Sequence, residues 1–221
     1  MAVSLTADGV PGTPQIISGD ALVSANSADV ALAAGDEVAV AVWRDDDLTT
    51  ILAQPLSFDG APVGDPAILD QGVLTRPPGI AAGGGGFLVT WSRRTVEDFE
   101  VFSRLLTGTG APEGEGRRLT WTISDETGAV PAWNGTTWGV AWFGNRANGT
   151  EECVDTNCED QAFASVLDAD GEMASVPVIL SDNANPSSNG DLAWDGSAWT
   201  MVFEVRRDWR QQVYRGRMVC E

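Results

Sequence analysis

The chain repeats one hairpin four times, and this repeat constrains the fold more than any other feature. In each copy a short apolar run ends in a glycine turn, and apolar residues follow at the third, fifth and seventh positions after the glycine. The glycines are Gly35, Gly84, Gly135 and Gly196, which lie 49, 51 and 61 positions apart. The apolar residues that follow them are Val38, Val40 and Val42; Phe87, Val89 and Trp91; Trp138, Val140 and Trp142; and Trp199, Met201 and Phe203. The period of about fifty residues indicates a repeat architecture.

A second landmark, Leu-x-x-x-Gly, lies between the hairpins and predicts a second turn in each unit. Its copies are Leu5–Gly9, Leu56–Gly60, Leu106–Gly110 and Leu167–Gly171, and in three of them an aspartate precedes the glycine. Asp-Gly between apolar runs is a tight-turn signal, because both residues tolerate positive φ. Apolar residues alternate with a period of two, which is typical of strands. Each unit therefore predicts four short antiparallel strands, and the chain is expected to be all-β.

Two segments carry a family resemblance. Residues 132–142 (Ala-Trp-Asn-Gly-Thr-Thr-Trp-Gly-Val-Ala-Trp) and 193–203 (Ala-Trp-Asp-Gly-Ser-Ala-Trp-Thr-Met-Val-Phe) resemble the repeats of bacterial secreted β-propeller proteins. The resemblance covers nearly the whole chain and implies a propeller blade for each unit. It implies no activity and supplies no catalytic residue, because the motif specifies the blade alone.

The expected architecture is a four-bladed β-propeller in one domain, residues 1–221. A single blade cannot bury both of its faces, whereas a ring stacks the faces and protects the strand edges. Three units cover approximately residues 21–72, 73–125 and 126–189, and the fourth combines residues 190–221 with residues 1–20. The ring is expected to close by pairing of the N- and C-terminal strands, Val3–Ser18 with Leu192–Phe203. A piece of a longer propeller would give the same pattern.

Composition excludes several partners. Thirteen basic and 32 acidic residues give a formal charge of −19, which opposes binding to nucleic acid and to anionic membranes. No apolar run is long enough to span a bilayer, so membrane insertion is not expected. An acidic, solubilising surface and the resemblance to secreted repeats favour an extracytoplasmic or secreted location, although no signal peptide begins this chain. The oligomeric state is left open.

An acidic loop in the third unit, residues 151–160, carries the candidate metal ligands. Asp155, Asn157, Glu159 and Asp160 offer the clustered oxygens that Ca²⁺ prefers. The glycine and the distal glutamate of a calcium loop are absent, so a solvated loop is the alternative. Cys153 and Cys158 lie in the same loop and are expected to form a disulfide, because two thiols without histidine cannot complete a zinc site.

Two further groups of residues are candidates for ligand binding. Arginines follow the second strand of each unit and are expected at one end of the ring, where they form ion pairs or hold a carboxylate; they are Arg44, Arg93, Arg146 and Arg206. Most of the nine tryptophans occupy repeated strand positions, which core packing explains. Trp121 and Trp209 lie off the pattern and are candidate platforms for a protein or glycan ligand.

The residue inventory restricts the chemistry. The chain has no histidine, which excludes a Ser-His-Asp triad and a histidine metal centre. Glycoside hydrolysis needs only two carboxylates and stays open. The sequence therefore favours a non-catalytic binding or interaction module, with a propeller glycoside hydrolase and a structural domain of a larger surface protein as alternatives.

We predict that Cys153 and Cys158 are disulfide-bonded, because the four residues between them allow a small loop to close within one oxidised segment. Mass spectrometry of the unreduced protein after alkylation should find neither thiol modified. Alkylation of both thiols would remove the argument for an oxidising compartment.

Overall fold

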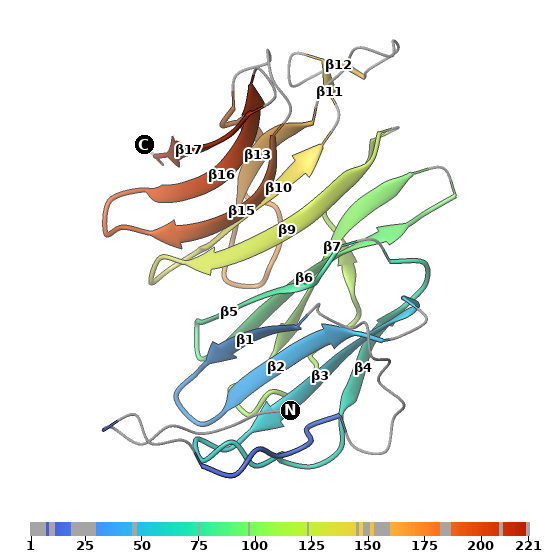
Figure 1. Cartoon of the computed structure of the whole chain (residues 1–221), viewed down its shortest axis with the longest axis vertical. Helices are drawn as coiled ribbons and strands as arrows, with labels where there is room; N and C mark the ends of the chain where they lie inside the picture. Colours follow the sequence, from blue (N-terminus) through green and yellow to red (C-terminus); the bar gives the residue numbers. More distant parts are fainter. Residues whose placement is uncertain are drawn as a thin grey trace.

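Figure 1 presents the structure, a computed structural model of the chain. It describes residues 8, 12–18, 30–45, 48–74, 76–96, 98–122, 124–144, 160–181, 187–207 and 210–219, together with the backbone of 146–147 and 151–152. The described residues form β-strands, turns and loops. None of them belongs to a helix long and apolar enough to cross a membrane.

The strands form four antiparallel sheets, and within each sheet consecutive strands are neighbours. Sheet 1 contains β1 (Val30–Ala34), β2 (Ala39–Arg44), β3 (Thr50–Leu56) and β4 (Ala67–Gln71). Sheet 2 contains β5 (Gly79–Gly83), β6 (Gly86–Arg94), β7 (Phe99–Leu106) and β8 (Arg117–Arg118). Sheet 3 contains β9 (Glu126–Trp133), β10 (Trp138–Gly144), β13 (Gln161–Leu167) and β14 (Val178–Ile179). Sheet 4 contains β15 (Ser187–Trp194), β16 (Trp199–Arg207) and β17 (Arg210–Met218), and a separate hairpin pairs β11 (Arg146–Ala147) with β12 (Glu151–Glu152).

In the repeated motif, an Asn or Asp side chain accepts hydrogen bonds from backbone N–H groups of the hairpin turn. In sheet 3 the Asn134 carboxamide oxygen accepts from the N–H groups of Thr136 and Thr137, at 2.8 and 2.7 Å. Asp195 does the same in sheet 4, at 2.9 Å to both Ser197 and Ala198. These bonds, together with one from the Ser197 hydroxyl, hold the pKa of Asp195 well below its ordinary value. The Asn/Asp-Gly pair is therefore a local turn signal with a physical cause.

The four sheets are stacked, and the core lies between them (Figure 1). Alternate residues of one strand point to opposite faces, so each inner sheet contacts one neighbour with each face. Val89 and Trp91 face sheet 1, whereas Leu88 faces sheet 3. In the same way Val140 faces sheet 2 and Ala141 faces sheet 4. The repeated strand and turn positions are expected to be buried, and this is confirmed for Val40, Val89, Val140, Met201, Leu56, Leu106 and Leu167. Leu5, the eighth such position, lies outside the described residues.

The first unit departs from the repeat by one residue. Val40 belongs to the cluster between sheets 1 and 2, whereas the equivalent positions in later units face the preceding sheet. A shift of one residue exchanges the two faces of a strand. Trp43 is consequently the counterpart of Trp91, and it lies on the outer face of sheet 1 with Ala41 and Leu56.

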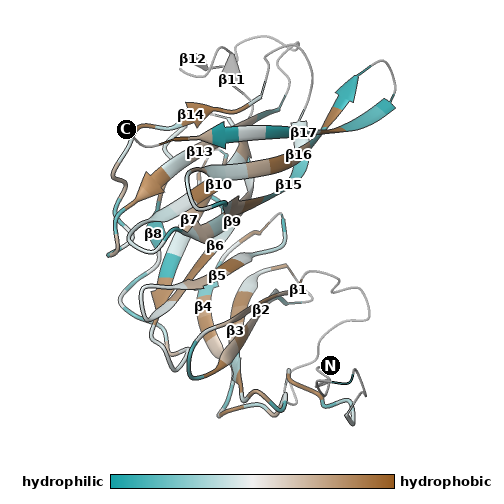
Figure 2. Ribbon diagram, turned by 90° about the vertical axis from the view of Figure 1, so that its left-hand side faces the viewer, coloured by the Kyte–Doolittle hydropathy of each residue, from teal (hydrophilic) through white to brown (hydrophobic). Residues whose placement is uncertain are grey.

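The expected closure of the ring is corrected by the described residues. No hydrogen bond joins sheet 1 to sheet 4 in this part of the chain, and the two sheets lie at opposite ends of the stack in Figure 1. Ile17 packs on Ala41, Trp43 and Leu56 of sheet 1, not on sheet 4. The physical reason is visible in Figure 2, where hydrophilic residues cover much of β17. The outer face of sheet 4 is partly polar, so it does not require the apolar cover that closure would supply.

We predict that Met201→Ala and Val202→Ala have very different costs, although the residues are neighbours on β16. Met201 is fully buried between sheets 3 and 4, and its truncation should lower the free energy of unfolding by about 2–5 kcal/mol. Val202 is 44% exposed on the outer face, and its truncation should cost within about 0.5 kcal/mol. Urea unfolding measures both. Equal losses would mean that a packed layer covers the outer face of sheet 4.

Candidate ligand-binding site

A hollow of about 250 Å³ lies where the first strands of three sheets begin; we call it the inner hollow. Its wall is formed by residues 76–78 before β5, residues 128–130 of β9 and residues 189–190 of β15, with Phe143 beside them. The register of each hairpin shows that these three segments are equivalent, because Gly79, Val130 and Asp191 pair with Thr90, Ala141 and Val202. The repeat therefore brings the same position of three units to one place.

Bulges in two first strands shape this hollow. The pairing of β9 with β10 shifts register between Ala141 and Phe143, and the pairing of β15 with β16 shifts between Ser188 and Gly190. The extra residues are at Gly128 and Asn189, which have φ of 67° and 43°. Positive φ is uncommon for a residue other than glycine, and such conformations concentrate at functional positions. Bulges likewise re-aim side chains beside binding sites.

The polar groups of the inner hollow are few. Arg76 is exposed and forms no ion pair with a described carboxylate. The Asn189 side-chain amide donates to the Glu204 carboxylate at 3.2 Å. The rest of the wall is proline, glycine and apolar side chains. This combination of a mainly apolar wall with a few polar groups is typical of a small-molecule site.

A second, larger depression of about 540 Å³ lies between residues 119–122, which follow β8, and residues 173–177, which follow β13. We call it the Trp121 groove. Trp121 is 69% exposed, whereas every other tryptophan in the described residues is buried or half-buried. The Arg118 guanidinium lies 5.6 Å from the centre of the Trp121 ring, within the range of a cation–π contact. Val176 and Pro177 form the opposite wall.

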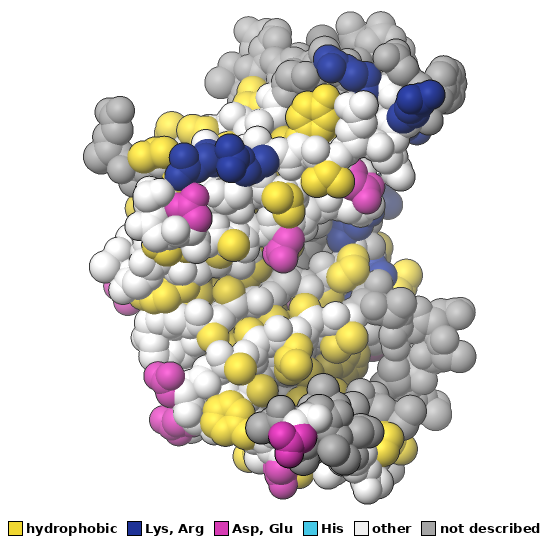
Figure 3. Space-filling model, turned by 60° about the vertical axis from the view of Figure 1, so that its left-hand side comes forward, with side chains coloured by type: hydrophobic (Ala, Val, Ile, Leu, Met, Phe, Trp, Pro, Cys, Tyr) yellow, Lys and Arg dark blue, Asp and Glu magenta, His cyan; other side chains and the backbone are white. Residues whose placement is uncertain are grey.

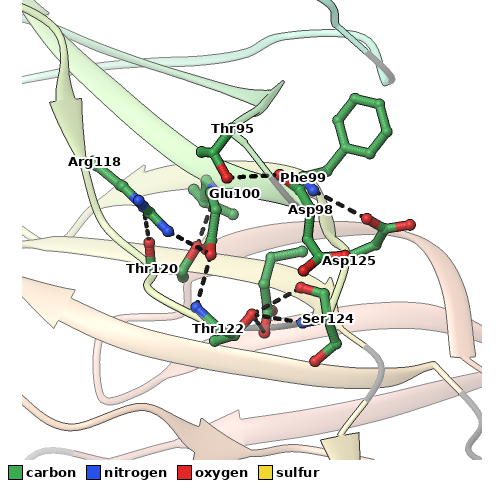
Figure 4. Close-up of polar contacts among 11 residues, drawn as sticks. Thr95, Asp98, Phe99, Glu100, Arg118, Thr120, Thr122, Ser124 and Asp125 are labelled. Carbon is green, nitrogen blue, oxygen red and sulfur yellow. Dashed lines mark hydrogen bonds and ion pairs between the residues drawn. The ribbon is translucent and has the colours of Figure 1, made fainter. Parts of the chain in front are cut away.

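Behind this groove lies a buried carboxylate, Glu100 (Figure 4). The Thr122 N–H and an Arg118 guanidinium N–H each donate to Glu100 Oε1 at 2.7 Å, and the Thr120 hydroxyl donates to the other oxygen. The Arg118 Nε–H donates to the Thr120 carbonyl at 2.6 Å, so the two residues that flank Leu119 are held together. Glu100 thereby fixes the backbone that carries Trp121.

Sheet 3 repeats this arrangement with neutral groups. Thr120 accepts from the Val101 N–H at 2.9 Å, and Ser181 accepts from the Ala162 N–H at 3.0 Å. Ser181 in turn donates to Gln161 Oε1 at 2.8 Å, as Thr120 does to Glu100. The same arrangement occurs in two sheets. In each, the buried acceptor, Glu100 or Gln161, joins the third strand of its sheet to the segment that follows the fourth strand.

The second fully buried carboxylate, Glu126, lies at the start of β9. It accepts from the Trp142 indole N–H, and the Thr122 hydroxyl lies 3.3 Å from it. Glu100 and Glu126 therefore lie on either side of Thr122. A glycosidase needs two carboxylates that face a substrate. Glu100 and Glu126 instead accept hydrogen bonds from donor groups of the protein, so their role in this arrangement is structural.

The predicted arginines occupy different surroundings. Arg93 pairs with Asp70 of sheet 1 at 2.6 Å and covers the Phe102 ring at 4.1 Å, and the same carboxylate accepts from the Trp91 indole. Arg44 is buried at the end of β2, and desolvation lowers its pKa despite the neighbouring Asp45. Arg206 is exposed at the end of β16. None of these three lines the inner hollow, whose arginine is Arg76.

Several predicted site residues lie outside the described part of the chain. They are Cys153, Cys158, Asp155, Asn157, Glu159, Trp209 and the side chain of Arg146. Asp160 is half-buried, and its carbonyl accepts from the Ser187 N–H at 2.6 Å. The described residues contain no group of three or more acidic or cysteine side chains placed to hold a metal ion.

Sequence reasoning identified Trp121 but missed Arg76, Asn189 and Gly128. The missed residues come together only because three units are stacked. The spacing of residues within one unit cannot predict this contact between units. One local signal was present, since residues 76–78 (Arg-Pro-Pro) directly precede β5. Consecutive prolines before a strand indicate a rigid entry segment.

Comparison with solved structures shows the class of fold. The neuraminidase-like protein of A/little yellow-shouldered bat/Guatemala aligns with a TM-score of 0.59 and 7% identity, over 86% of this chain and 55% of that one. The neuraminidase-like protein of A/flat-faced bat/Peru aligns with a TM-score of 0.56 and 10% identity, over 86% and 49%. An α-L-arabinofuranosidase from Podospora anserina reaches a TM-score of 0.49 with 9% identity, over 89% and 65%. No family model and no curated protein matches the sequence.

The two neuraminidase-like matches, together with the sheets of this chain, establish an all-β, propeller-like arrangement of antiparallel sheets. The identities are too low to carry more than the fold. The chain spans about half the length of the neuraminidase-like structures that it matches.

We predict that Glu100→Ala destabilises the protein by about 2–3 kcal/mol, because it leaves buried donors from Arg118, Thr120 and Thr122 without an acceptor. Glu100→Gln should cost less, since the amide oxygen replaces part of the acceptor, as Gln161 does in sheet 3. Glu115→Ala, at an exposed position, is the matched control and should change stability by no more than about 0.5 kcal/mol. Equal urea midpoints for all three variants would contradict the role of Glu100.

Proposed function

We propose that the protein is a non-catalytic, extracytoplasmic binding module whose Trp121 groove holds a carbohydrate. The observation that carries this proposal is the exposure of Trp121 in a chain whose other described tryptophans are packed into the sheets. An indole has a large apolar face, and leaving it in water costs free energy unless a ligand uses it. The apolar C–H face of a sugar ring is a matching partner.

The walls of the groove support the same ligand class. Thr122 and Ser175 provide polar groups to the lining, and Met173 and Pro177 provide apolar contact. A sugar presents hydroxyl groups at its edge and C–H groups on its face, which fits a site with both kinds of wall. The buried Glu100 holds the segment around Trp121 in place, so the platform is pre-formed and loses little entropy on binding.

The enzymatic alternative receives less support. The propeller-like fold is shared with neuraminidase-like proteins, but a fold does not define an activity. The two fully buried carboxylates, Glu100 and Glu126, accept hydrogen bonds from the protein itself. An acid and a nucleophile would instead need to face a shared cleft. Binding without turnover is therefore the function that we propose.

We propose that each of the four sheets is one propeller blade. The described residues leave the outer faces of sheets 1 and 4 apart. The extracytoplasmic location rests on the acidic composition and the proposed glycan ligand.

We predict that Trp121→Ala lowers the affinity about 30-fold or more for the oligosaccharide that the protein selects from an immobilised glycan panel, as expected for an aromatic anchor. Trp121→Phe should retain part of the affinity, and the melting temperature should stay unchanged because Trp121 is exposed. Isothermal titration calorimetry measures the affinities.

Arg76→Ala, in the inner hollow, is the matched control and should bind as the parent protein does. Loss of binding in Arg76→Ala but not in Trp121→Ala would place the sugar in the inner hollow and contradict the proposal. Release of new reducing ends from the bound oligosaccharide would show that the protein is an enzyme.

A further inference from the structure

Among the described residues, sheet 4 has one strand fewer than each of the other three sheets. Sheets 1, 2 and 3 each have four strands, whereas sheet 4 ends at β17 among the described residues. In sheets 2 and 3 the fourth strand pairs with the third at Phe102 and Phe163. The equivalent residue of β17 is Tyr214, which lies opposite Phe203 as Phe102 lies opposite Trp91. The repeat therefore marks the place where a fourth strand would pair.

The edge at this place is open. β17 is nine residues long and pairs only with β16, so every second residue turns its N–H and C=O groups away from the sheet. Val213 is 77% exposed, and the neighbouring Gln212 and Arg215 are exposed as well. Leu180 packs on the inner face of sheet 4 at Gly216 and does not lie along the edge. Residues 210–215 pair with β16 on one side and with no described strand on the other.

Three exposed arginines of β16 and β17 lie beside this edge. Arg206, Arg210 and Arg215 are exposed and form no ion pair with a described carboxylate, although the chain carries a net charge of −19. Arg217, by contrast, is paired with Asp195 at 3.0 Å. Figure 3 shows most of the dark-blue side chains gathered in the upper part of the molecule, at the end of the stack formed by sheet 4. A basic strip next to an open strand edge is complementary to an acidic, extended segment.

We propose that β17 accepts an extended, acidic segment of a partner protein as the fourth strand of sheet 4. Main-chain hydrogen bonds to residues 210–215 provide the affinity, and carboxylates of the added strand pair with Arg215 and Arg206. A second copy of this chain does not fit the same edge. Pairing β17 with itself would place arginines near one another, and like charges across strands are destabilising. This inference is independent of the Trp121 groove.

The test uses the full chain and a fluorescein-labelled peptide of about eight residues in which glutamate alternates with valine, a length typical of a strand. Fluorescence anisotropy should show binding of this peptide and none of a matched peptide with lysine in place of glutamate. A third peptide, with proline at its centre, should not bind, because proline cannot donate to the ladder. Equal binding of the proline peptide would overturn strand addition.

Variants locate the contact. Arg215→Glu should weaken binding of the acidic peptide roughly tenfold, since it places a like charge opposite the ligand. Arg76→Glu makes the same change of charge on another sheet and should leave the affinity within about twofold. Equal losses in both variants would reduce the effect to overall charge and overturn the proposal.

Hydrogen exchange gives a second readout. The amides of Val213 and Arg215 should become protected when the acidic peptide binds, whereas those of β4 should not change. Full protection of these two amides before the peptide is added would show that the chain itself covers this edge, and it would also overturn the proposal.

Discussion

The structure depends on the packing of apolar strand faces between successive sheets. A sheet in water must bury at least one face, and the two inner sheets of this chain bury both because each lies between two others. The large side chains at the seventh position after the turn glycine are central to this packing. Trp91 and Trp142 are fully buried there, and each donates its indole N–H to a carboxylate, Asp70 or Glu126. The indole N–H groups of these two tryptophans are therefore hydrogen-bonded although the rings are buried.

The outer faces of sheets 1 and 4 differ from the faces that are buried between sheets. On sheet 1, the shift of one residue leaves Trp43 on the outer face, and Ile17 covers part of it. On sheet 4, the outer face carries Thr200, Glu204 and Arg215, which are compatible with water. The terminal units of repeat proteins often have one polar face, because no neighbour covers it. The candidate sites lie where the repeat is interrupted, at the bulges of the inner hollow, at the segment that carries Trp121 and at the edge of β17.

The local sequence pattern predicted many of the strands and turns of this fold, but few of the residues at its candidate sites. Period-two alternation located the strands around Val140 and Met201, and the Asn134-Gly135 and Asp195-Gly196 pairs located their turns, because both signals act within a few residues. The sequence places Trp43 one residue out of phase with the repeat, and the structure shows the consequence, because Trp43 lies on the outer face of sheet 1. The ring closure was wrong for the described residues, because it was inferred from the strands expected at the two termini, whereas Ile17 packs on sheet 1. Thr200, Glu204 and Arg206 point outward from sheet 4. Trp121 was predicted as a platform because it interrupts the repeat, whereas Arg76 and Asn189 meet only through the stacking of three units.

The central claim is that the outer faces of sheets 1 and 4 lie at opposite ends of a stack. Leu32 and Val202 are exposed positions on these two faces. Pulsed electron–electron double resonance between spin labels at Leu32→Cys and Val202→Cys, in a Cys220→Ser background, measures the distance between them. Four sheets spaced by about 10 Å predict a distance of roughly 30 Å or more. A closed ring would bring the two faces into contact, and a distance near 10–15 Å, the spacing of directly packed sheets, would contradict the account.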